Sequence, residues 1–216
     1  QKNIDALAIE NINSFDSINW IKNKKPDIIF CFGWSRILKK ELLEIPKLGV
    51  LGFHPSLLPL NKGRHPIIWA LVLGLEETGS TFFLMDENVD TGDIISQERI
   101  RISNVDDAFS LYTKIEFTAK KQIRLLLPKL KNGNFKRSKQ EKKYSNSWRK
   151  RSFLDGVIDW RMSSLSIHNL VKAITKPYSG ASFKYMGKDV IVWKTLIVQE
   201  SSKNQEPGKV LYVDSD

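Results

Sequence analysis

The chain has 216 residues, which at about 150 residues per domain predicts one full domain and part of a second. Hydrophobic residues at 41% and charged residues at 27% are typical of a globular protein and exclude a wholly disordered or fibrous chain. The longest apolar run, residues 67–75, is far shorter than the ~20 residues that span a bilayer, so we expect no membrane partner. The single cysteine, Cys31, cannot form an internal disulfide, and without a signal-like start we expect a cytoplasmic location.

Positive charge is concentrated in one segment, residues 120–151. It contains about 13 basic residues against Glu141 alone, so it accounts for more than the whole net charge of +10 and leaves the rest close to neutral. Such a segment can attract the phosphates of RNA or of a nucleotide-linked ligand, and it can equally be a solvated helix end with a linker. The charge pattern leaves both interpretations open.

Short apolar runs alternate with helical patterns in the first part of the chain. Strands are expected at residues 4–9, 27–33 and 49–53, and helices at residues 15–22, capped by Ser14, and 36–43. The nearly unbroken apolar run at residues 27–33 predicts a strand buried on both faces of a parallel sheet. Strand, helix and strand in this order predict a βαβ unit and therefore an α/β fold.

The middle of the chain continues the alternation. A helix is expected over residues 67–75 with Pro66 in its first turn, followed by strands at 80–85 and 94–102, the second resembling an edge strand. Residues 105–130 predict a long helix capped by Ser103 or Asn104. Its expected apolar side consists of Phe109, Tyr112, Ile115, Phe117 and Leu125.

The last part of the chain predicts a linker and a small β-rich domain. Residues 132–157 are basic and poor in apolar residues, which is typical of a linker. A helix at 164–174 and short strands at 183–185, 190–193 and 210–213 follow, with a turn at Gly187 and Lys188. We therefore expect domains at residues 1–131 and 158–216, joined by the linker at 132–157.

Two loops carry the ionisable groups that could perform chemistry. Residues 54–59 follow one predicted parallel strand and residues 86–93 follow another, and open α/β sheets place their sites at such carboxyl ends. A histidine there, such as His54, can act as a general acid or base, and a nearby carboxylate can keep it protonated. Taken alone, each loop is more often a hydrogen-bonded strand end or a simple turn than a functional site.

A metal site is not expected. The acidic loop begins like an EF-hand, but the positions that need Gly and Glu hold Thr91 and Gln97. The chain also lacks the Cys and His spacing of a zinc site.

Taken together, these segments resemble the folate-dependent formyltransferases. The resemblance rests on residues 54–59 followed by Gly63, Arg64 and Pro66, on residues 77–81, and on residues 89–94. It covers most of the chain and is strongest between residues 33 and 102. It implies a Rossmann-like catalytic domain with a mostly parallel sheet, followed by the start of an OB-like domain. It also implies that the family's opening strand and glycine-rich loop precede Gln1, so we expect the chain to be part of a longer protein.

The resemblance implies transfer of a formyl group from 10-formyltetrahydrofolate to an amine, without a metal. Protonated His54 would face the developing oxyanion, while Asp90 would keep it protonated and relay the amine proton. Arg64 and Tyr178 are candidates for binding the substrate. The residues implied to bind the folate are Ser35, Arg36, Ile37, Leu38, Ser56, Leu57, Leu58, Pro59, Asp86, Glu87, Asn88 and Val89.

One position departs from the family's pattern of Asn, any residue, His. Gly52 stands where the Asn is usual, and losing such an oxyanion donor can cost ~10²–10³ in rate. Either a water, a backbone N–H or another side chain substitutes, or the chain is a weak or decayed enzyme.

The family's branches differ in the amine that they formylate. The C-terminal extension argues against the purine-pathway enzymes, which resemble the catalytic domain alone. Residues 33–35, 148–151 and 176–178 look more like the branch that acts on nucleotide-linked amino sugars. The basic segment keeps methionyl-tRNA as the alternative. From another class, the chain could be a decayed nucleic-acid-binding module, and a homodimer is compatible with the sequence.

Overall fold

The computed structural model describes residues 4–198 and 205–213. It divides into two compact units, each built from three stretches of chain. The first unit comprises Gln1–Gly63, Gly79–Glu98 and Thr118–Ser147, and the second comprises Arg64–Thr78, Arg99–Phe117 and Trp148–Asp216.

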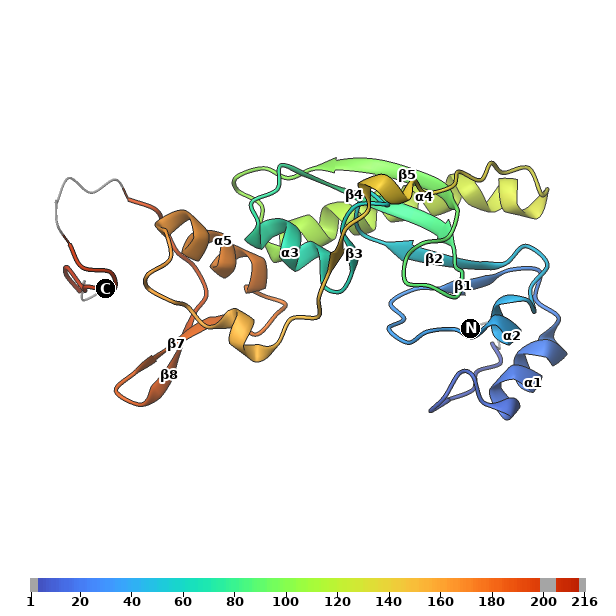
Figure 1. The fold of residues 1–216 in the computed structure, drawn as a ribbon, viewed down its shortest axis with the longest axis horizontal. Helices are drawn as coiled ribbons and strands as arrows, with labels where there is room; N and C mark the ends of the chain where they lie inside the picture. Colours follow the sequence, from blue (N-terminus) through green and yellow to red (C-terminus); the bar gives the residue numbers. More distant parts are fainter. Residues whose placement is uncertain (1–3, 199–204, 214–216) are drawn as a thin grey trace. The chain divides into compact units, whose positions relative to one another are not determined.

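A four-stranded sheet forms the framework of the fold (Figure 1). Its strands, in the order β1-β2-β4-β5, are β1 (Ile29–Cys31), β2 (Val50–His54), β4 (Glu77–Leu84) and β5 (Ile94–Arg101). β1 and β2 pair in parallel, as expected for a βαβ unit, and the α/β fold class is confirmed. β2 and β4 run antiparallel, with Leu51 opposite Leu84 and His54 opposite Thr81.

The first two helices differ in length from those expected. Helix α1 (Phe15–Lys24) begins where expected, because the Ser14 side chain accepts a hydrogen bond from the Ser17 backbone. Helix α2 (Lys40–Leu43) lacks its expected first turn. The reason is that the Asn13 side chain binds the carbonyl of Ile37 at 3.0 Å and the N–H of Lys39 at 2.8 Å, so these groups are already satisfied outside a helix.

One of the expected strands is absent and another is shorter than expected. Residues 4–9 form no strand. The strand expected at 27–33 is limited to β1 and is not buried on both faces, since Phe30 is 41% exposed. In the described sheet β1 has β2 as its one neighbour, which leaves it at an edge.

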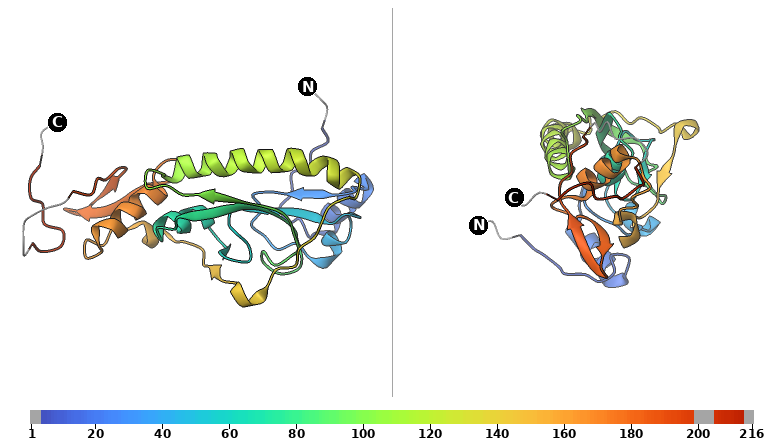
Figure 2. Two further views of the ribbon diagram at one scale, coloured as in Figure 1. Left: turned by 90° about the horizontal axis from the view of Figure 1, so that it is seen from above. Right: turned by 90° about the vertical axis from the view of Figure 1, so that its left-hand side faces the viewer.

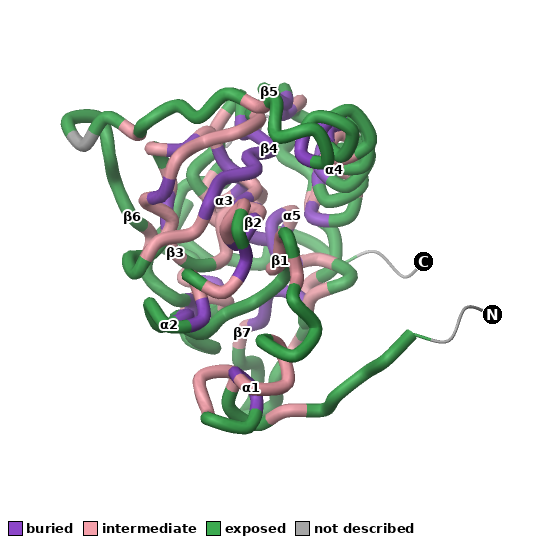
Figure 3. The backbone as a smooth tube through the Cα atoms, turned by 90° about the vertical axis from the view of Figure 1, so that its right-hand side faces the viewer, coloured by how far each residue is buried: buried purple, intermediate pink, exposed green. Residues whose placement is uncertain are grey.

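The core of the first unit lies between the sheet and helix α4 (Ala108–Lys131), which runs beside the strands (Figure 2). Leu51 of β2, Phe82 of β4 and Leu126 and Leu130 of α4 form one buried cluster. Buried positions accordingly follow β2 and β4 (Figure 3).

The apolar side expected for α4 is wrong except for Ile115. Phe109, Tyr112, Phe117 and Leu125 are exposed, whereas Leu111, Ile115, Leu126 and Leu130 are buried. The buried side also contains Gln122, whose amide donates to the Ser80 carbonyl at 3.1 Å and the Ser96 hydroxyl at 2.9 Å. A polar residue in the middle of the buried side hides it from a hydrophobicity pattern. The N-terminal cap is also different, because Ser110 N–H binds the Asp107 carboxylate and not Ser103 or Asn104.

The second unit packs two helices against each other and adds a hairpin. Helices α3 (Pro66–Val72) and α5 (Ser164–Ile174) are in contact. Helix α5 has the expected bounds, whereas α3 ends at Val72 and not at residue 75. Strands β7 (Ala181–Tyr185) and β8 (Lys188–Val192) pair antiparallel. Their turn is Met186 and Gly187, both with positive φ, and not Gly187 and Lys188. The strand expected at 210–213 is absent.

The segment between the two predicted domains contains short elements of its own. A 3-10 turn, η1 (Lys142–Tyr144), precedes strand β6 (Ser147–Trp148), and a second, η2 (Phe153–Gly156), follows it. β6 pairs with β3 (Lys62–Gly63), and Ser138 forms a bridge with Ile94. Within the described residues, no helix is long and apolar enough to cross a membrane.

Asp106 stabilises the loop before α4 and generates a testable prediction. It is 3% exposed and accepts hydrogen bonds from Ser103 N at 2.7 Å, Ser103 Oγ at 2.8 Å, Ser110 Oγ at 2.9 Å and Lys114 Nζ at 2.5 Å. Burial alone would raise the pKa of Asp106, but the hydrogen bonds, that of Lys114 first, outweigh it and lower the pKa from 3.8 to about 2.

We expect Asp106→Asn to lower the free energy of unfolding at pH 7 by about 2 kcal/mol, the usual value for a hydrogen-bonded charged group. Because the folded-state pKa lies below that of the unfolded chain, this contribution is complete above the unfolded pKa and is lost as the pH falls through about 2. Urea unfolding at pH 7 and near pH 2 measures the difference, with Asp189→Asn in an exposed ion pair as control. An equal difference at both pH values would contradict the assignment.

Candidate active site

His54 is buried at the end of a central strand and meets an oxygen at each ring nitrogen. It is the last residue of β2 and is 5% exposed. Its Nε2 lies 2.8 Å from the Asn61 carbonyl oxygen, and its Nδ1 lies 3.5 Å from Asp90 Oδ2. A neutral imidazole carries one N–H, so only the imidazolium donates to both oxygens.

Asp90 reaches His54 by a different route from the one expected. The acidic loop does not follow a parallel strand, because β4 is antiparallel to β2 and its last residue, Leu84, lies beside Leu51. The loop must turn back to bring Asp90 to His54. It does so with Asp90 in the left-handed region at φ 54°, and Asp90 Oδ2 accepts from the Gly63 N–H at 2.9 Å.

The Asp90 loop is held by its own residues. Asp86 Oδ1 accepts from the Asn88 N–H at 3.0 Å and from the Thr91 hydroxyl at 2.6 Å. A Cβ atom at Gly92 would lie 1.6 Å from the Leu84 carbonyl oxygen, so no other residue fits that position. Asp86 is half-buried, whereas Glu87, Asn88 and Val89, also predicted to bind folate, are exposed.

The predicted folate-binding loop after His54 is tightly fixed. Ser56 is fully buried, and its hydroxyl donates to the Leu60 carbonyl at 2.8 Å. Gln97 donates to the Leu58 carbonyl at 2.8 Å. Leu57 and Pro59 are half-buried, and Leu57 packs directly on Gly79. Ser56 and Leu58 are thus enclosed by protein, which suits a role in shaping the loop rather than in touching a ligand.

The other predicted folate-binding segment borders a cavity of the first unit. Ser35 and Arg36 line this space of about 740 Å³ together with residues 9–11, 33 and 34. Arg36 also donates to the Glu10 carbonyl. Ile37 is exposed, whereas Leu38 is buried in the core. The cavity has the size of a typical small-molecule pocket.

Three residues that sequence reasoning missed support the His54 and Asp90 loops. Asn61 and Asn146 form two hydrogen bonds with each other. The Asn61 backbone N–H donates to Asn146 Oδ1 at 2.6 Å, and Asn146 Nδ2 donates to Asn61 Oδ1 at 3.0 Å. Gln140 Nε2 donates to the carbonyls of Asp90 at 2.9 Å and Gly92 at 2.8 Å. Gln140 and Asn146 belong to the basic segment, where their residue types carry no distinguishing signal. Asn61 did carry one, since asparagine is enriched in the left-handed conformation that it adopts at φ 61°.

The space beside Gly52 is already occupied. A Cβ atom there would lie 2.9 Å from both Phe83 Cζ and Met85 Cγ. An asparagine side chain therefore does not fit at this position unless these two side chains move.

The two predicted substrate-binding residues lie in the second unit. Arg64 is exposed and Tyr178 is half-buried, and burial raises the pKa of Tyr178. Part of the basic segment also serves the structure of this unit. Arg149 and Arg151 lie over the Trp69 ring at 5.2 and 5.0 Å, and Arg149 forms a two-pronged ion pair with Asp155, which lowers the pKa of Asp155. These two arginines are therefore not free surface charges.

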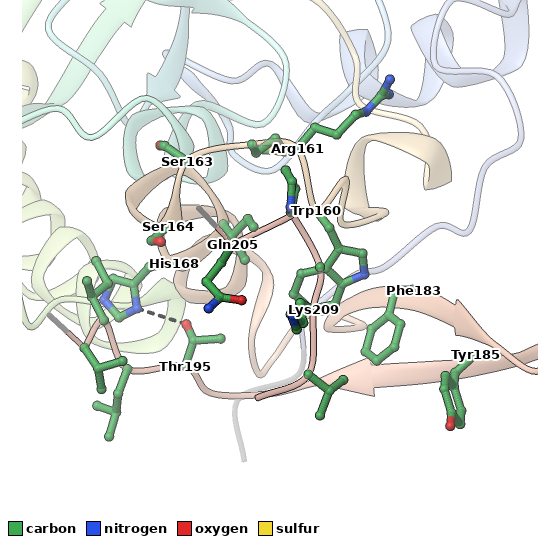
Figure 4. A pocket seen from close by; sticks show the side chains of 18 of the residues that line it. Trp160, Arg161, Ser163, Ser164, His168, Phe183, Tyr185, Thr195, Gln205 and Lys209 are labelled. Atoms are coloured by element: carbon green, nitrogen blue, oxygen red, sulfur yellow. Dashed lines mark hydrogen bonds between the residues drawn. The ribbon is translucent and has the colours of Figure 1, made fainter. Parts of the chain in front are cut away.

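A second cavity lies wholly within the second unit (Figure 4). Its volume is about 750 Å³, and the T-shaped pair of Trp160 and Phe183 forms part of its wall. Its three long cationic side chains are each paired with a carboxylate: Arg161 with Asp159, Lys184 with Asp189, and Lys209 with Glu206. The cavity includes none of the predicted site residues. Across the described ranges, no group of three or more His, Cys, Asp and Glu side chains could hold a metal ion.

Comparisons with known proteins agree on one family. Residues 11–127 match the family model described as formyl transferase, and residues 153–216 match that of the formyl transferase C-terminal domain. The chain is 38% identical over 208 residues to the bifunctional polymyxin resistance protein ArnA of Wigglesworthia glossinidia brevipalpis, covering 96% of this chain and 32% of that protein. The chain thus spans about a third of the length of this relative.

Two solved structures are also similar. One is the N-formyltransferase from Helicobacter canadensis in complex with folinic acid and dTDP-3-aminofucose, with TM-score 0.66 and 25% identity over 82% of this chain and 64% of that one. The other is methionyl-tRNA formyltransferase from Clostridium thermocellum, with TM-score 0.67 and 20% identity over 86% of this chain and 83% of that one. At that identity the second likeness concerns the fold alone.

The contacts at Gly52 predict that restoring an asparagine there is harmful. We expect Gly52→Asn to lower the free energy of unfolding by about 1–3 kcal/mol, the usual cost of forcing extra atoms into a packed core. Urea unfolding measures the change, and the double variant with Phe83→Ala, which removes one of the two side chains that the asparagine meets, is expected to lose less than the sum of the two single variants. An unchanged unfolding midpoint for the single variant would contradict the packing described.

Proposed function

Because the chain belongs to the formyl transferase family, we propose that it transfers the formyl group of 10-formyltetrahydrofolate to the amine of a nucleotide-linked amino sugar. The observation that carries the proposal is the buried pair in which His54 Nδ1 lies 3.5 Å from Asp90 Oδ2. The cavity beside Ser35 and Arg36 has room for part of a folate. A location in the cytoplasm, a catalytic part at residues 1–131, a basic linker at 132–157 and an OB-like part from residue 158 belong to the same proposal.

The folate supplies an activated formyl carbon, and the protein's residues handle charge and protons. When the amine attacks that carbon, a C–N bond forms and negative charge develops on the formyl oxygen. His54 as an imidazolium stabilises this oxyanion. Asp90 accepts the proton that the amine loses, and the proton passes to N10 of the folate as its bond to the formyl carbon breaks. Burial of the pair strengthens its electrostatic effect by excluding water.

The amino-sugar substrate is favoured over tRNA by three observations. The Helicobacter relative was solved with folinic acid and dTDP-3-aminofucose, and residues 148–151 and 176–178 resemble the amino-sugar branch. Arg149 and Arg151 are engaged with Trp69 and Asp155, which removes two charges from those available to RNA. Methionyl-tRNA stays the second candidate because of the remaining lysines and arginines of residues 120–143.

The direct test is incubation with 10-formyltetrahydrofolate and a panel of amines. The panel holds UDP- and dTDP-linked amino sugars and methionyl-tRNA, and a formyl mass gain on each is scored. A formyl mass gain on an amino sugar supports the proposal. A mass gain on methionyl-tRNA alone would show that the second candidate is the substrate. No gain on any amine, together with salt-sensitive RNA binding, would favour a decayed nucleic-acid-binding module.

We expect His54→Ala to lower kcat by about 10³-fold and Asp90→Asn by about 10²-fold, in the range for removed acid–base groups. The dissociation constant for folinic acid, measured by calorimetry, is expected to change less than about twofold for Asp90→Asn, since proton handling rather than ligand contact is its role. His168→Ala, a histidine of the second unit bonded to Thr195, is the matched control. Unchanged turnover in His54→Ala would overturn the proposed mechanism.

A further inference from the structure

Both loops that form the His54 and Asp90 pair are held by one stretch of the basic segment, residues 138–147. Asn146 binds the loop that contacts His54, and Gln140 binds the loop that carries Asp90. The stretch is itself anchored, because Ser138 and Ile94 exchange two backbone hydrogen bonds, of 2.9 and 2.8 Å. It lies outside both family-model matches, which end at residue 127 and resume at residue 153.

The peptide group between Asn61 and Lys62 connects Asn146 to His54. Its carbonyl oxygen lies 2.8 Å from His54 Nε2, and its N–H, that of Lys62, donates to the backbone carbonyl of Asn146 at 3.2 Å. The Asn146 side chain also holds the two groups just before this peptide, because its Oδ1 accepts from the Asn61 backbone N–H and its Nδ2 donates to Asn61 Oδ1. Donation by the N–H also polarises the carbonyl toward the imidazole, because hydrogen bonds in a chain strengthen one another.

Gln140 holds the second loop with both protons of its amide nitrogen. One contacts the Asp90 carbonyl at 2.9 Å and the other the Gly92 carbonyl at 2.8 Å. Its Oε1 is buried without a partner in the described part of the chain, which usually costs about 1–3 kcal/mol. The Oε1 of Gln140 is therefore left without a hydrogen bond within the described residues, while its two N–H donors fix the direction of the loop.

The hydrogen bonds of Asn146 and those of Gln140 both act on the pair of His54 and Asp90. Asp90 Oδ2 accepts from the Gly63 N–H, and Gly63 directly follows the peptide group that Asn146 holds. Moving either loop would therefore alter both oxygens that face the imidazole.

We propose that Gln140 and Asn146 are positioning residues for the formyl transfer, acting through Asn61 and Asp90 to align His54. This inference rests on the proposed function. It assigns to the basic segment a role that does not depend on its charge.

The test uses three variants of the full chain and one control. Asn146→Ala removes the side-chain bonds to Asn61, whereas Asn146→Asp keeps the acceptor for Asn61 N, and a half-turn of the Asn61 amide presents its Nδ2 as a donor to the second Asp oxygen. Gln140→Glu keeps the size but places an oxygen against the carbonyls of Asp90 and Gly92. Asn134→Ala, an exposed asparagine earlier in the same segment, is the matched control.

We expect Asn146→Ala and Gln140→Glu to lower kcat roughly tenfold, since loss of alignment alone can cost up to ~10²-fold. KM for the folate and for the amine should stay within about twofold, because neither residue is placed in ligand contact. Asn146→Asp should recover most of the lost kcat, and Asn134→Ala should behave like the wild type. A general loss of structure would not produce this split between kcat and KM.

Amide hydrogen exchange separates this inference from the proposed function. We expect the Asn61 amide to exchange at least about tenfold faster in Asn146→Ala, because its one acceptor is removed. If the wild type formylates no amine, the proposed function fails, while faster exchange at Asn61 in Asn146→Ala still shows that Asn146 holds the loop that contacts His54. Wild-type kcat in both Asn146→Ala and Gln140→Glu, or unchanged exchange at Asn61, would overturn the inference.

Discussion

A buried imidazole needs an acceptor for each of its nitrogen-bound protons when it is charged, and this requirement organises the first unit. His54 ends a strand whose backbone is already paired with β1 and β4, so the sheet offers its side chain no oxygen. Both acceptors come from loops, at Asn61 and Asp90. Each of these residues adopts the left-handed conformation, at φ 61° and 54°, which turns the chain sharply enough to aim an oxygen at the ring.

Local signals in the sequence located the elements whose ends are decided by neighbouring residues. Ser14 caps α1 and Pro66 begins α3 as expected, since each acts within one turn of helix. Such local signals do not predict the direction of β4. A connection that contains a helix, as β2 to β4 does with α3, favours a parallel crossover, and yet β4 returns antiparallel. Likewise, Gln122 conceals the buried side of α4 because its hydrogen-bond partners are distant in sequence.

The same distinction applies to the site. His54 and Asp90 lie in compact motifs, so the sequence could identify them, although not the route by which the Asp90 loop reaches the strand end. Asn146 bonds a residue 85 positions away and Gln140 one 50 positions away. Neither has a local pattern that separates it from other polar residues of a basic segment. The charge of that segment predicts phosphate binding, while its uncharged amides contact the loops that carry Asn61 and Asp90.

The pairing of β6 with β3 and the bridge between Ser138 and Ile94 have a consequence for how such chains diverge. Gln140 and Asn146 lie between these two fixed points, so the length of chain that joins them is constrained at both ends. One inserted residue would shift the register of β6 and turn its side chains to the opposite face. Lysines and arginines along this stretch can therefore be replaced during evolution, whereas its length cannot change. Relatives should vary here by substitution and not by insertion or deletion.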